Sequence, residues 1–189
     1  EQPGKSTARH CSAFGEEGAT DGSLIQSCKI LMEKARTLLG VTEEQSQNVL
    51  NLRFLPHTAH FGSSFYEDFA LRGIRVDRVE PGLVVCTFTV PARLTGANGN
   101  LLAGGVANLI DELGASVIHV DGRPMDLSVD MSISYVSTAK LDDELEITAR
   151  LLGCKGGYWG TQVILMNKTT GEVVAEGRHS LFSRSISKI

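Results

Sequence analysis

The hydrophobic and polar positions follow three different rhythms along the chain. Residues 1 to about 23 are rich in Gly, Ser, Thr, Glu and Asp and lack large apolar residues, which predicts a flexible tail. From Leu24 the apolar positions recur at spacings of three and four, which predicts an amphipathic helix capped by Ser23 and ended by Gly40. A second, short helix is predicted over 42–50.

Strand-like alternation replaces the helical rhythm further along. One run begins at Ile74 and slips by one position at Val79, and a second covers 83–90, so the turn Pro81-Gly82 between them predicts a β-hairpin. The segment 103–118 is apolar in helical rhythm and has no Lys or Arg, which predicts a buried helix. Four further strands are predicted over 127–136, 143–154, 158–167 and 172–183.

The predicted order of elements in the main domain is β-β-α-β-β-β-β. One apolar helix followed by four strands excludes a doubly wound parallel sheet, in which helices and strands alternate. We therefore predict an α+β fold, in which one antiparallel sheet wraps around one central helix. The predicted organisation is a tail over 1–23, a helical N-terminal extension over 24–70 and the sheet domain over 71–189. A sheet this small leaves an edge or a face for self-association.

Composition narrows the class of protein. The 189 residues suit one domain with an appendage, and 42% hydrophobic with 21% charged residues is typical of a globular chain. A net charge of −4 without a basic run argues against a nucleic-acid partner. Apolar stretches stop short of the roughly 20 residues of a membrane helix, and no signal-peptide pattern opens the chain, so neither membrane insertion nor secretion is expected.

The cysteines point to the compartment. The four of them lie far apart without a C-x-x-C motif, and no His stands at zinc-finger spacing, so we predict reduced thiols and no metal site. We expect an intracellular protein, with the cytoplasm as the first choice and a mitochondrion or another organelle as the alternative. Because the numbering begins at Glu1 rather than at Met, we expect a processed or trimmed product whose targeting signal, if any, has been lost.

The start of the apolar helix and its first acidic residue are the main candidates for chemistry. Ala103, Gly104 and Gly105 let another group approach free N–H groups that favour a carbonyl oxygen acquiring negative charge, although the glycines alternatively serve only packing. An unpaired carboxylate at Asp111 is costly on an apolar helix, so Asp111 needs partners or a chemical role. The alternative is a solvated helical turn shared with Glu112.

One later strand adds two candidates. Ser128 alternates within the predicted strand and either holds water or fills the sheet, and Tyr135 is either a substrate contact or part of the core. The chain has no G-x-S-x-G motif, no P-loop and no G-x-G-x-x-G followed by a nucleotide-type βαβ unit.

Six short pieces between Thr95 and about Phe182 carry a family resemblance. They are 107–111 (ANLID), 128–135 (SVDMSISY), 139–141 (AKL), 147–149 (ITA), 167–171 (NKTTG) and 177–179 (GRH). In order, and nearly in spacing, they resemble the hotdog-fold acyl-CoA thioesterases of the PaaI-like class, the acyl-coenzyme A thioesterase 13 type. The resemblance covers nearly half of the chain and implies a hotdog fold for the sheet domain.

The resemblance assigns roles to some residues. In that family a His-Gly-Gly signature opens the central helix, an acid nine residues beyond the His does the chemistry, and a Ser on a later strand helps to hold water. Carried over, Asp111 matches the acid and Ser128 the serine. The signature itself is altered, because Leu102 stands in place of the His and Ala103 and Gly104 stand in place of the two glycines.

A second departure lies upstream of the helix. The family's Asn, which helps to polarise the thioester carbonyl, maps to Gly96, although Asn98 and Asn100 lie close by. The backbone N–H of Ala103 does not depend on the side chain, so the main electrostatic element of the site is retained.

The resemblance implies hydrolysis of acyl-CoA thioesters to the free acid and CoA. The thioester carbonyl would face the Ala103 N–H, while Asp111 of the neighbouring subunit acts as general base or nucleophile and Ser128 orients the water. The acyl-CoA substrate would lie at the interface of a homodimer or homotetramer, with its acyl chain between the central helices of two subunits. No cofactor is expected, because CoA is part of the substrate.

The CoA portion is expected near the turn at 153–157, where Lys155 suits a phosphate. The candidate substrate-binding residues are Asn98, Asn100, Leu102, Tyr135, Lys155, Gly156 and Gly157. Two alternatives to the hydrolase remain. Leu102 and Gly96 favour a weakened hotdog module that binds acyl-CoA or a protein without turnover, and a dehydratase of the same fold lacks its expected catalytic His.

Overall fold

The computed structural model describes residues 21–40, 42–51, 65–119 and 127–183. The chain divides into two units, Glu1–Phe54 and Leu55–Ile189. The predicted tail lies outside the described residues except for its last three positions, and the predicted domain boundaries stay a prediction. Within the described ranges, no helix is both long and apolar enough to cross a bilayer.

The first unit contains two helices, α1 (Asp21–Leu39) and α2 (Glu43–Leu50), which confirms the helical rhythm of this part of the chain. The end predicted at Gly40 is confirmed, because the N–H of Gly40 donates to the carbonyl oxygen of Arg36 at 2.7 Å. The predicted cap is wrong: α1 begins before Ser23, which lies inside the first turn. The N–H groups of the first turn have no acceptor within the helix, so the start of a helix can shift by one or two residues without loss of a helical hydrogen bond.

The second helix is held by its cap. The hydroxyl of Thr42 accepts a hydrogen bond from the N–H of Gln45 at 3.1 Å, and the Gln45 side chain accepts one from the N–H of Thr42 at 2.8 Å. This reciprocal pair is a capping box, and it satisfies two N–H groups that the helix itself leaves free.

The second unit contains the sheet and the apolar helix in the predicted order. Its elements are α3 (Phe65–Leu71), β1 (Ile74–Glu80), β2 (Leu83–Thr89), the 3-10 turn η1 (Ala92–Leu94), α4 (Ala103–His119), β3 (Leu127–Tyr135), β4 (Glu144–Lys155), β5 (Tyr158–Asn167) and β6 (Val173–Phe182). The six strands form one antiparallel sheet in the order β1-β2-β4-β5-β6-β3.

Two details of the sheet differ from, or go beyond, the sequence pattern. The slip expected at Val79 lies earlier, as a bulge between Val76 and Arg78, where Asp77 has no opposite residue in the register with β2. The strand β3 pairs with β6 and so forms the edge of the sheet opposite β1. The chain thus places its third strand beside its last one.

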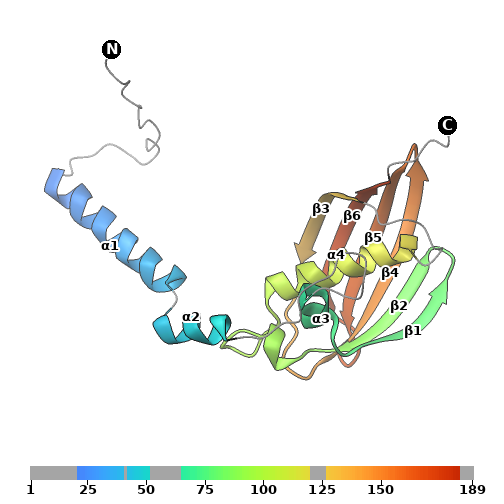
Figure 1. Cartoon of the computed structure of the whole chain (residues 1–189), viewed down its shortest axis with the longest axis horizontal. Helices are drawn as coiled ribbons and strands as arrows, with labels where there is room; N and C mark the ends of the chain where they lie inside the picture. The colour runs from blue at the N-terminus through green and yellow to red at the C-terminus, as the bar shows by residue number, and fades with distance from the viewer. Residues whose placement is uncertain (1–20, 41, 52–64, 120–126, 184–189) are drawn as a thin grey trace, which may run out of the picture. The chain divides into compact units, whose positions relative to one another are not determined.

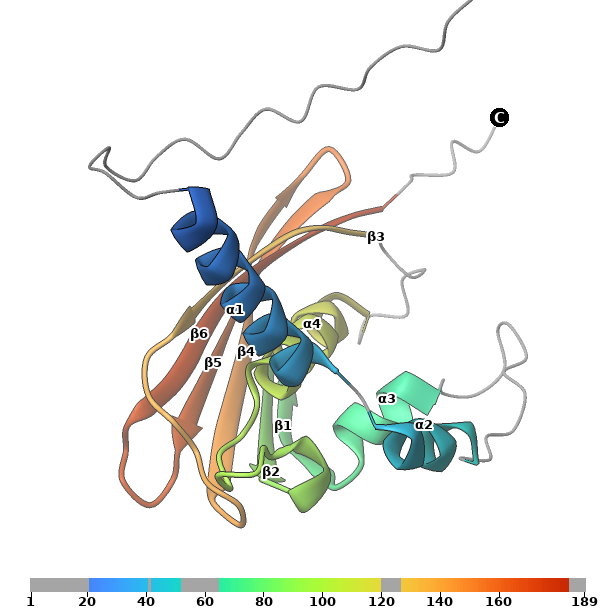
Figure 2. The same cartoon turned by 90° about the vertical axis from the view of Figure 1, so that its left-hand side faces the viewer.

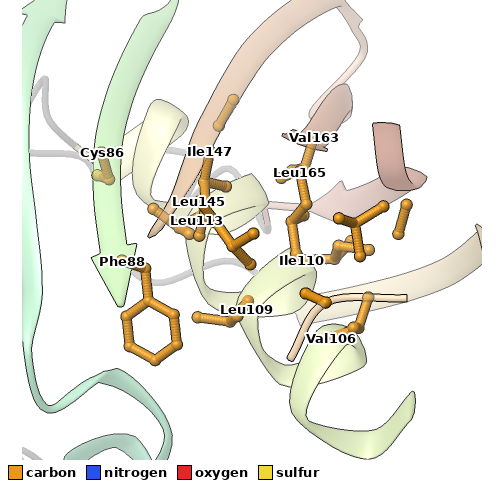
Figure 3. Close-up of a cluster of buried hydrophobic side chains, with 14 of the residues drawn as sticks. Cys86, Phe88, Val106, Leu109, Ile110, Leu113, Leu145, Ile147, Val163 and Leu165 are labelled. Carbon is orange, nitrogen blue, oxygen red and sulfur yellow. The ribbon is translucent and has the colours of Figure 1, made fainter. Parts of the chain in front are cut away.

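The helix α4 crosses one face of the sheet and supplies the centre of its core (Figure 1). Figure 2, turned by 90°, shows the same helix against the curved sheet. Its buried side chains meet those of β2, β4 and β5 (Figure 3). The largest fully buried apolar side chains in this cluster are Phe88, Leu109, Ile110, Leu145, Ile147 and Leu165.

A glycine on β6 lets α4 approach the sheet closely. A Cβ placed on Gly177 would lie 2.5 Å from Cγ2 of Ile110, so the space that a side chain would take is filled by the helix. Ile110 directly precedes Asp111, and this contact therefore fixes the height of Asp111 above the sheet.

Candidate active site

Three polar side chains from three elements meet beside α4. The hydroxyl of Ser128 on β3 donates to Oδ1 of Asp111 on α4 at 3.2 Å. Nε2 of His179 on β6 lies 3.0 Å from the Ser128 oxygen and 3.2 Å from the same Asp111 oxygen. The pairing of β3 with β6 brings the serine and the histidine together, and α4, packed on the sheet, places the Asp111 carboxylate beside them.

The three residues differ in exposure. His179 is only 1% exposed, whereas the Asp111 side chain is 46% exposed. Burial lowers the pKa of His179, and the nearby Asp111 carboxylate only partly opposes this effect. The imidazole is therefore neutral near pH 7. A carboxylate can only accept hydrogen bonds, so Nε2 carries the proton, and the buried Nδ1 has no partner among the described residues.

A second glycine makes room for the histidine. A Cβ on Gly114, one turn after Asp111, would lie 2.9 Å from both Nδ1 of His179 and Oγ1 of Thr161. The Thr161 hydroxyl in turn donates to the carbonyl oxygen of His179 at 3.2 Å. The imidazole is thus enclosed by α4, β5 and β6, and it presents Nε2 to Asp111 in one orientation.

Sequence reasoning assigned no role to His179, although it belongs to the piece 177–179 that carries the family resemblance. A signal was present in the alternation of β6, where Gly177, His179 and Leu181 share the buried face of the strand. A histidine on the apolar face of a strand needs a partner, and the acid on the central helix was the obvious candidate.

The start of α4 is open. Among the described residues no acceptor receives the N–H groups of Ala103 and Gly104, and both residues are exposed. The packing interpretation of the two glycines holds for Gly105 alone: its Cβ would lie 3.1 Å from Leu101 Cδ1, whereas a Cβ on Gly104 would meet nothing within 4 Å. Tyr135 lies here rather than in the core, because its hydroxyl donates to the Ala103 carbonyl at 3.3 Å.

The loop before α4 explains how the altered signature is accommodated. A Cβ on Gly96 would lie 3.1 Å from Cδ2 of Leu102 and 3.2 Å from Oδ1 of Asn98. The Asn98 oxygen is also engaged in its own turn, where it accepts from the N–H of Asn100 at 3.1 Å. The Leu102 side chain, 50% exposed, thus occupies the space beside Gly96, and the two departures from the family pattern fit each other.

Within one chain the two halves of the site lie apart. Asp111 follows Ala103 by eight residues on the same helix, which is about 12 Å at a rise of 1.5 Å per residue. The structure therefore brings Asp111, Ser128 and His179 together, and it places Ala103, Gly104 and Tyr135 in a second group.

The turn between β4 and β5 lies at the Ser128 end of the sheet. Gly156 and Gly157 have φ angles of 61° and 83°, as a tight turn requires, and Lys155 is exposed. In the register, Ser128 is opposite Leu181, which is opposite Trp159 near the start of β5. The turn is thus separated from Ser128 by the width of β6 and β5.

A hollow of about 400 Å³ lies next to Asp111, and we call it the Asp111 hollow. Its lining includes Asp111 and Ser128 together with Glu67, Leu71, Glu112, Ala115, Ser116, His119 and Leu181. A small molecule in this hollow has access to the exposed part of the Asp111 carboxylate.

Comparisons with known proteins show which family the chain is similar to. The chain is 39% identical over 101 residues to human acyl-coenzyme A thioesterase 13, covering 53% of this chain and 72% of that protein. Zebrafish thioesterase superfamily member 2 superposes with a TM-score of 0.60 at 32% identity, covering 64% of this chain and 87% of that one.

The fold is shared more widely. A hypothetical thioesterase from Streptococcus pneumoniae, solved with coenzyme A, has a TM-score of 0.58 at 22% identity, over 64% of this chain and 94% of that one. No protein-family model matches the chain. The antiparallel sheet around one helix confirms the predicted hotdog fold. The chain belongs to the acyl-coenzyme A thioesterase 13 family of hotdog-fold proteins.

Proposed function

We propose that this chain hydrolyses acyl-CoA thioesters with Asp111 as the general base. The observation that carries the proposal is the environment of its carboxylate: the contacts from Ser128 and His179 are both to Oδ1. No hydrogen bond to Oδ2 occurs among the described residues, and Asp111 lines the Asp111 hollow. A held carboxylate with one free oxygen is suited to accept a proton from water.

The reaction balances with water as the only co-reactant. As the water oxygen attacks the carbonyl carbon, Asp111 takes a proton from it, and the carbonyl electrons move onto the oxygen. When the carbonyl re-forms, the C–S bond breaks, and Asp111 returns the proton to the leaving CoA sulfur. Direct attack by the carboxylate is the second route; it forms a mixed anhydride and releases CoA, and water then cleaves the anhydride. Label in Asp111 after a single turnover in ¹⁸O-water would establish this route, because general-base attack by water labels only the free acid.

We infer that the site is shared between two copies of the chain, with the N–H of Ala103 from one and Asp111 from the other. The separation of these groups along α4 supports this arrangement. The strand β3 also ends the sheet and exposes apolar side chains that a second copy would cover: Leu127, Val129, Met131 and Tyr135. A homodimer is the smallest assembly that provides such a site, and a homotetramer contains two such dimers.

Complementation tests the shared site. Ala103→Pro removes the N–H at the first helical position, where proline is tolerated, and Asp111→Asn removes the base. Each variant alone is expected to lose turnover. Refolded together, the two chains form mixed dimers in which one site has both wild-type groups, so activity returns. No recovery in dimers confirmed by light scattering would show that the site is not shared.

We place the CoA phosphates near Lys155, Gly156 and Gly157. This turn carries an exposed cation at the Ser128 end of the sheet, and cations of this kind bind phosphate. Lys155→Glu is expected to raise KM for acyl-CoA with little change in kcat, because the phosphates lie far from the reacting carbonyl.

The binding module is the second candidate function, and Leu102 favours it because its side chain occupies the space beside Gly96. Asp111→Asn decides between the two. In the hydrolase this variant lowers turnover by about 10²–10⁴-fold, the range for general acid–base catalysis, while affinity for CoA changes little. A wild-type rate equal to that of Asp111→Asn, with acyl-CoA still bound, would favour the binding module.

A further inference from the structure

The Asp111 hollow borders a second cavity at Glu112. This cavity, which we call the chamber, has a volume of about 250 Å³ and lies between α3, α4, β1 and β2. The chamber and the Asp111 hollow share three lining residues, Leu71, Glu112 and Ser116. An acyl chain whose thioester lies at Asp111 comes nearest to the chamber at these three side chains, which we call the collar.

The chamber beyond the collar is apolar. Its remaining lining residues are Ile74, Val76, Val79, Val84, Cys86 and Leu113. Burial raises the pKa of the Cys86 thiol to about 11, so this side chain is neutral as well. At about 30 Å³ for a group of the size of water, the chamber has room for roughly eight such groups. These properties suit the hydrocarbon part of a medium-length acyl chain.

Two of the three collar side chains, Glu112 and Ser116, are polar, and they offer hydrogen-bond acceptors. The Ser116 hydroxyl already donates its proton to the carbonyl oxygen of Leu113 at 2.8 Å, so its oxygen is left only as an acceptor. The Glu112 carboxyl is partly buried and has no hydrogen bond or ion pair to any other described residue. Burial, followed by the charges of Glu67 and Asp111, raises its pKa. A plain methylene at the collar leaves this group without a partner.

We propose that Glu112 determines acyl-group specificity: the preferred thioesters carry a hydroxyl close to the thioester that bonds to Glu112, and their apolar tail fills the chamber. This inference rests on the proposed function, which places the thioester at Asp111. A hydroxyl matches the collar in either state of the carboxyl group, because it donates to a carboxylate and accepts from a carboxylic acid. An N–H group can only donate, so it is the poorer match.

Turnover of two thioesters that differ by one oxygen tests the proposal. The probes are 3-hydroxyoctanoyl-CoA and octanoyl-CoA, and the measured quantity is the ratio of their kcat/KM values. Wild-type protein is expected to favour the hydroxyacyl thioester by about tenfold or more. Glu112→Gln keeps an acceptor oxygen and most of the preference, whereas Glu112→Leu brings the ratio to one or below. Glu172→Leu, on an exposed turn, is the matched control and keeps the wild-type ratio.

Two results would overturn the proposal: an unchanged ratio in Glu112→Leu, or a wild-type protein that cleaves octanoyl-CoA at least as efficiently. If neither thioester is cleaved, the proposed function fails instead, and affinities then decide the specificity. Asp111→Asn protein is expected to bind 3-hydroxyoctanoyl-CoA more tightly than octanoyl-CoA, and Asp111→Asn with Glu112→Leu is expected to lose this difference. Equal affinities in the first protein would contradict the role of Glu112.

Discussion

The middle of α4 and its start contribute to the same proposed site in opposite ways. At the middle, the helix lies so close to the sheet that Gly114 and Gly177 have no room for a side chain, and His179 is enclosed beneath Asp111. At the start, Ala103 and Gly104 are exposed, and their N–H groups have no acceptor among the described residues. The Asp111 carboxylate is thus held in place within one chain, whereas the N–H groups at the start of α4 can donate to a carbonyl oxygen of another molecule.

Among variants that leave Asp111 in place, the largest effect is expected from removing its support. His179→Leu removes the buried donor to Oδ1, and the freed carboxylate is expected to lower kcat by up to about 10²-fold, as small misplacements of reacting groups do. KM for acyl-CoA should change little, because His179 is buried and acts through Asp111. His179→Gln keeps a donor at the same reach and should restore part of kcat. Equal losses in both variants would mean that the imidazole does more than position the carboxylate.

The next largest effect is expected on the free energy of unfolding, which should respond differently to changes in the middle and at the start of α4. Gly114→Ala pushes a methyl group against His179 and Thr161 and is expected to lower the free energy of unfolding by about 1–3 kcal/mol, measured in urea. Gly104→Ala is the matched control, since its new methyl group meets open space. Its stability should stay level or rise. Similar losses at both positions would contradict the contrast between the anchored middle and the open start.

The neutral state of His179 predicts a smaller effect of pH. Its pKa is lowered by burial, so below about pH 6.5 the unfolded chain binds a proton that the folded chain refuses. Wild-type stability should therefore fall relative to His179→Gln as the pH drops from 7 to 5, by at most about 1.4 kcal/mol per pH unit. Other titrating groups, Glu112 among them, are common to both proteins and cancel. Parallel urea midpoints across this range would show that His179 protonates in the folded state.

The smallest effect is expected at the open end. Leu102→His should leave turnover level or raise it a few-fold without loss of fold, because Leu102 is half exposed. Gly96→Asn alone should be destabilising, since its Cβ would press on Leu102. The double variant should tolerate the asparagine better than the single one does. Thermal melting and steady-state turnover on the same preparations check both statements.

Much of the fold was predictable from periodicity, because α4 and the strands β4, β5 and β6 each bury one face and their patterns record it. The seven-residue helix α3 was not, since it is too short to display a period. The strand order was also out of reach: nothing in the alternation of β3 indicates that its partner is β6, a strand more than forty residues later.

The candidate site was likewise predictable only in part: its residues could be named, but not their contacts. Asp111 and Ser128 were predicted as separate candidates from their residue types and from the family resemblance. Their contact depends on the distant pairing of β3 with β6, and His179 was missed because its role exists only once that pairing is made.

The glycine contacts of α4 also determine which walls of the site can move. A shift of α4 toward the sheet would press Ile110 against β6 at Gly177 and bring the helix at Gly114 against His179, so α4 is the tightly packed wall of the site. Entry of an acyl chain must therefore displace other walls. Leu71 of α3 lines both the Asp111 hollow and the chamber, so a displacement of this short helix would change the shape of both cavities at once.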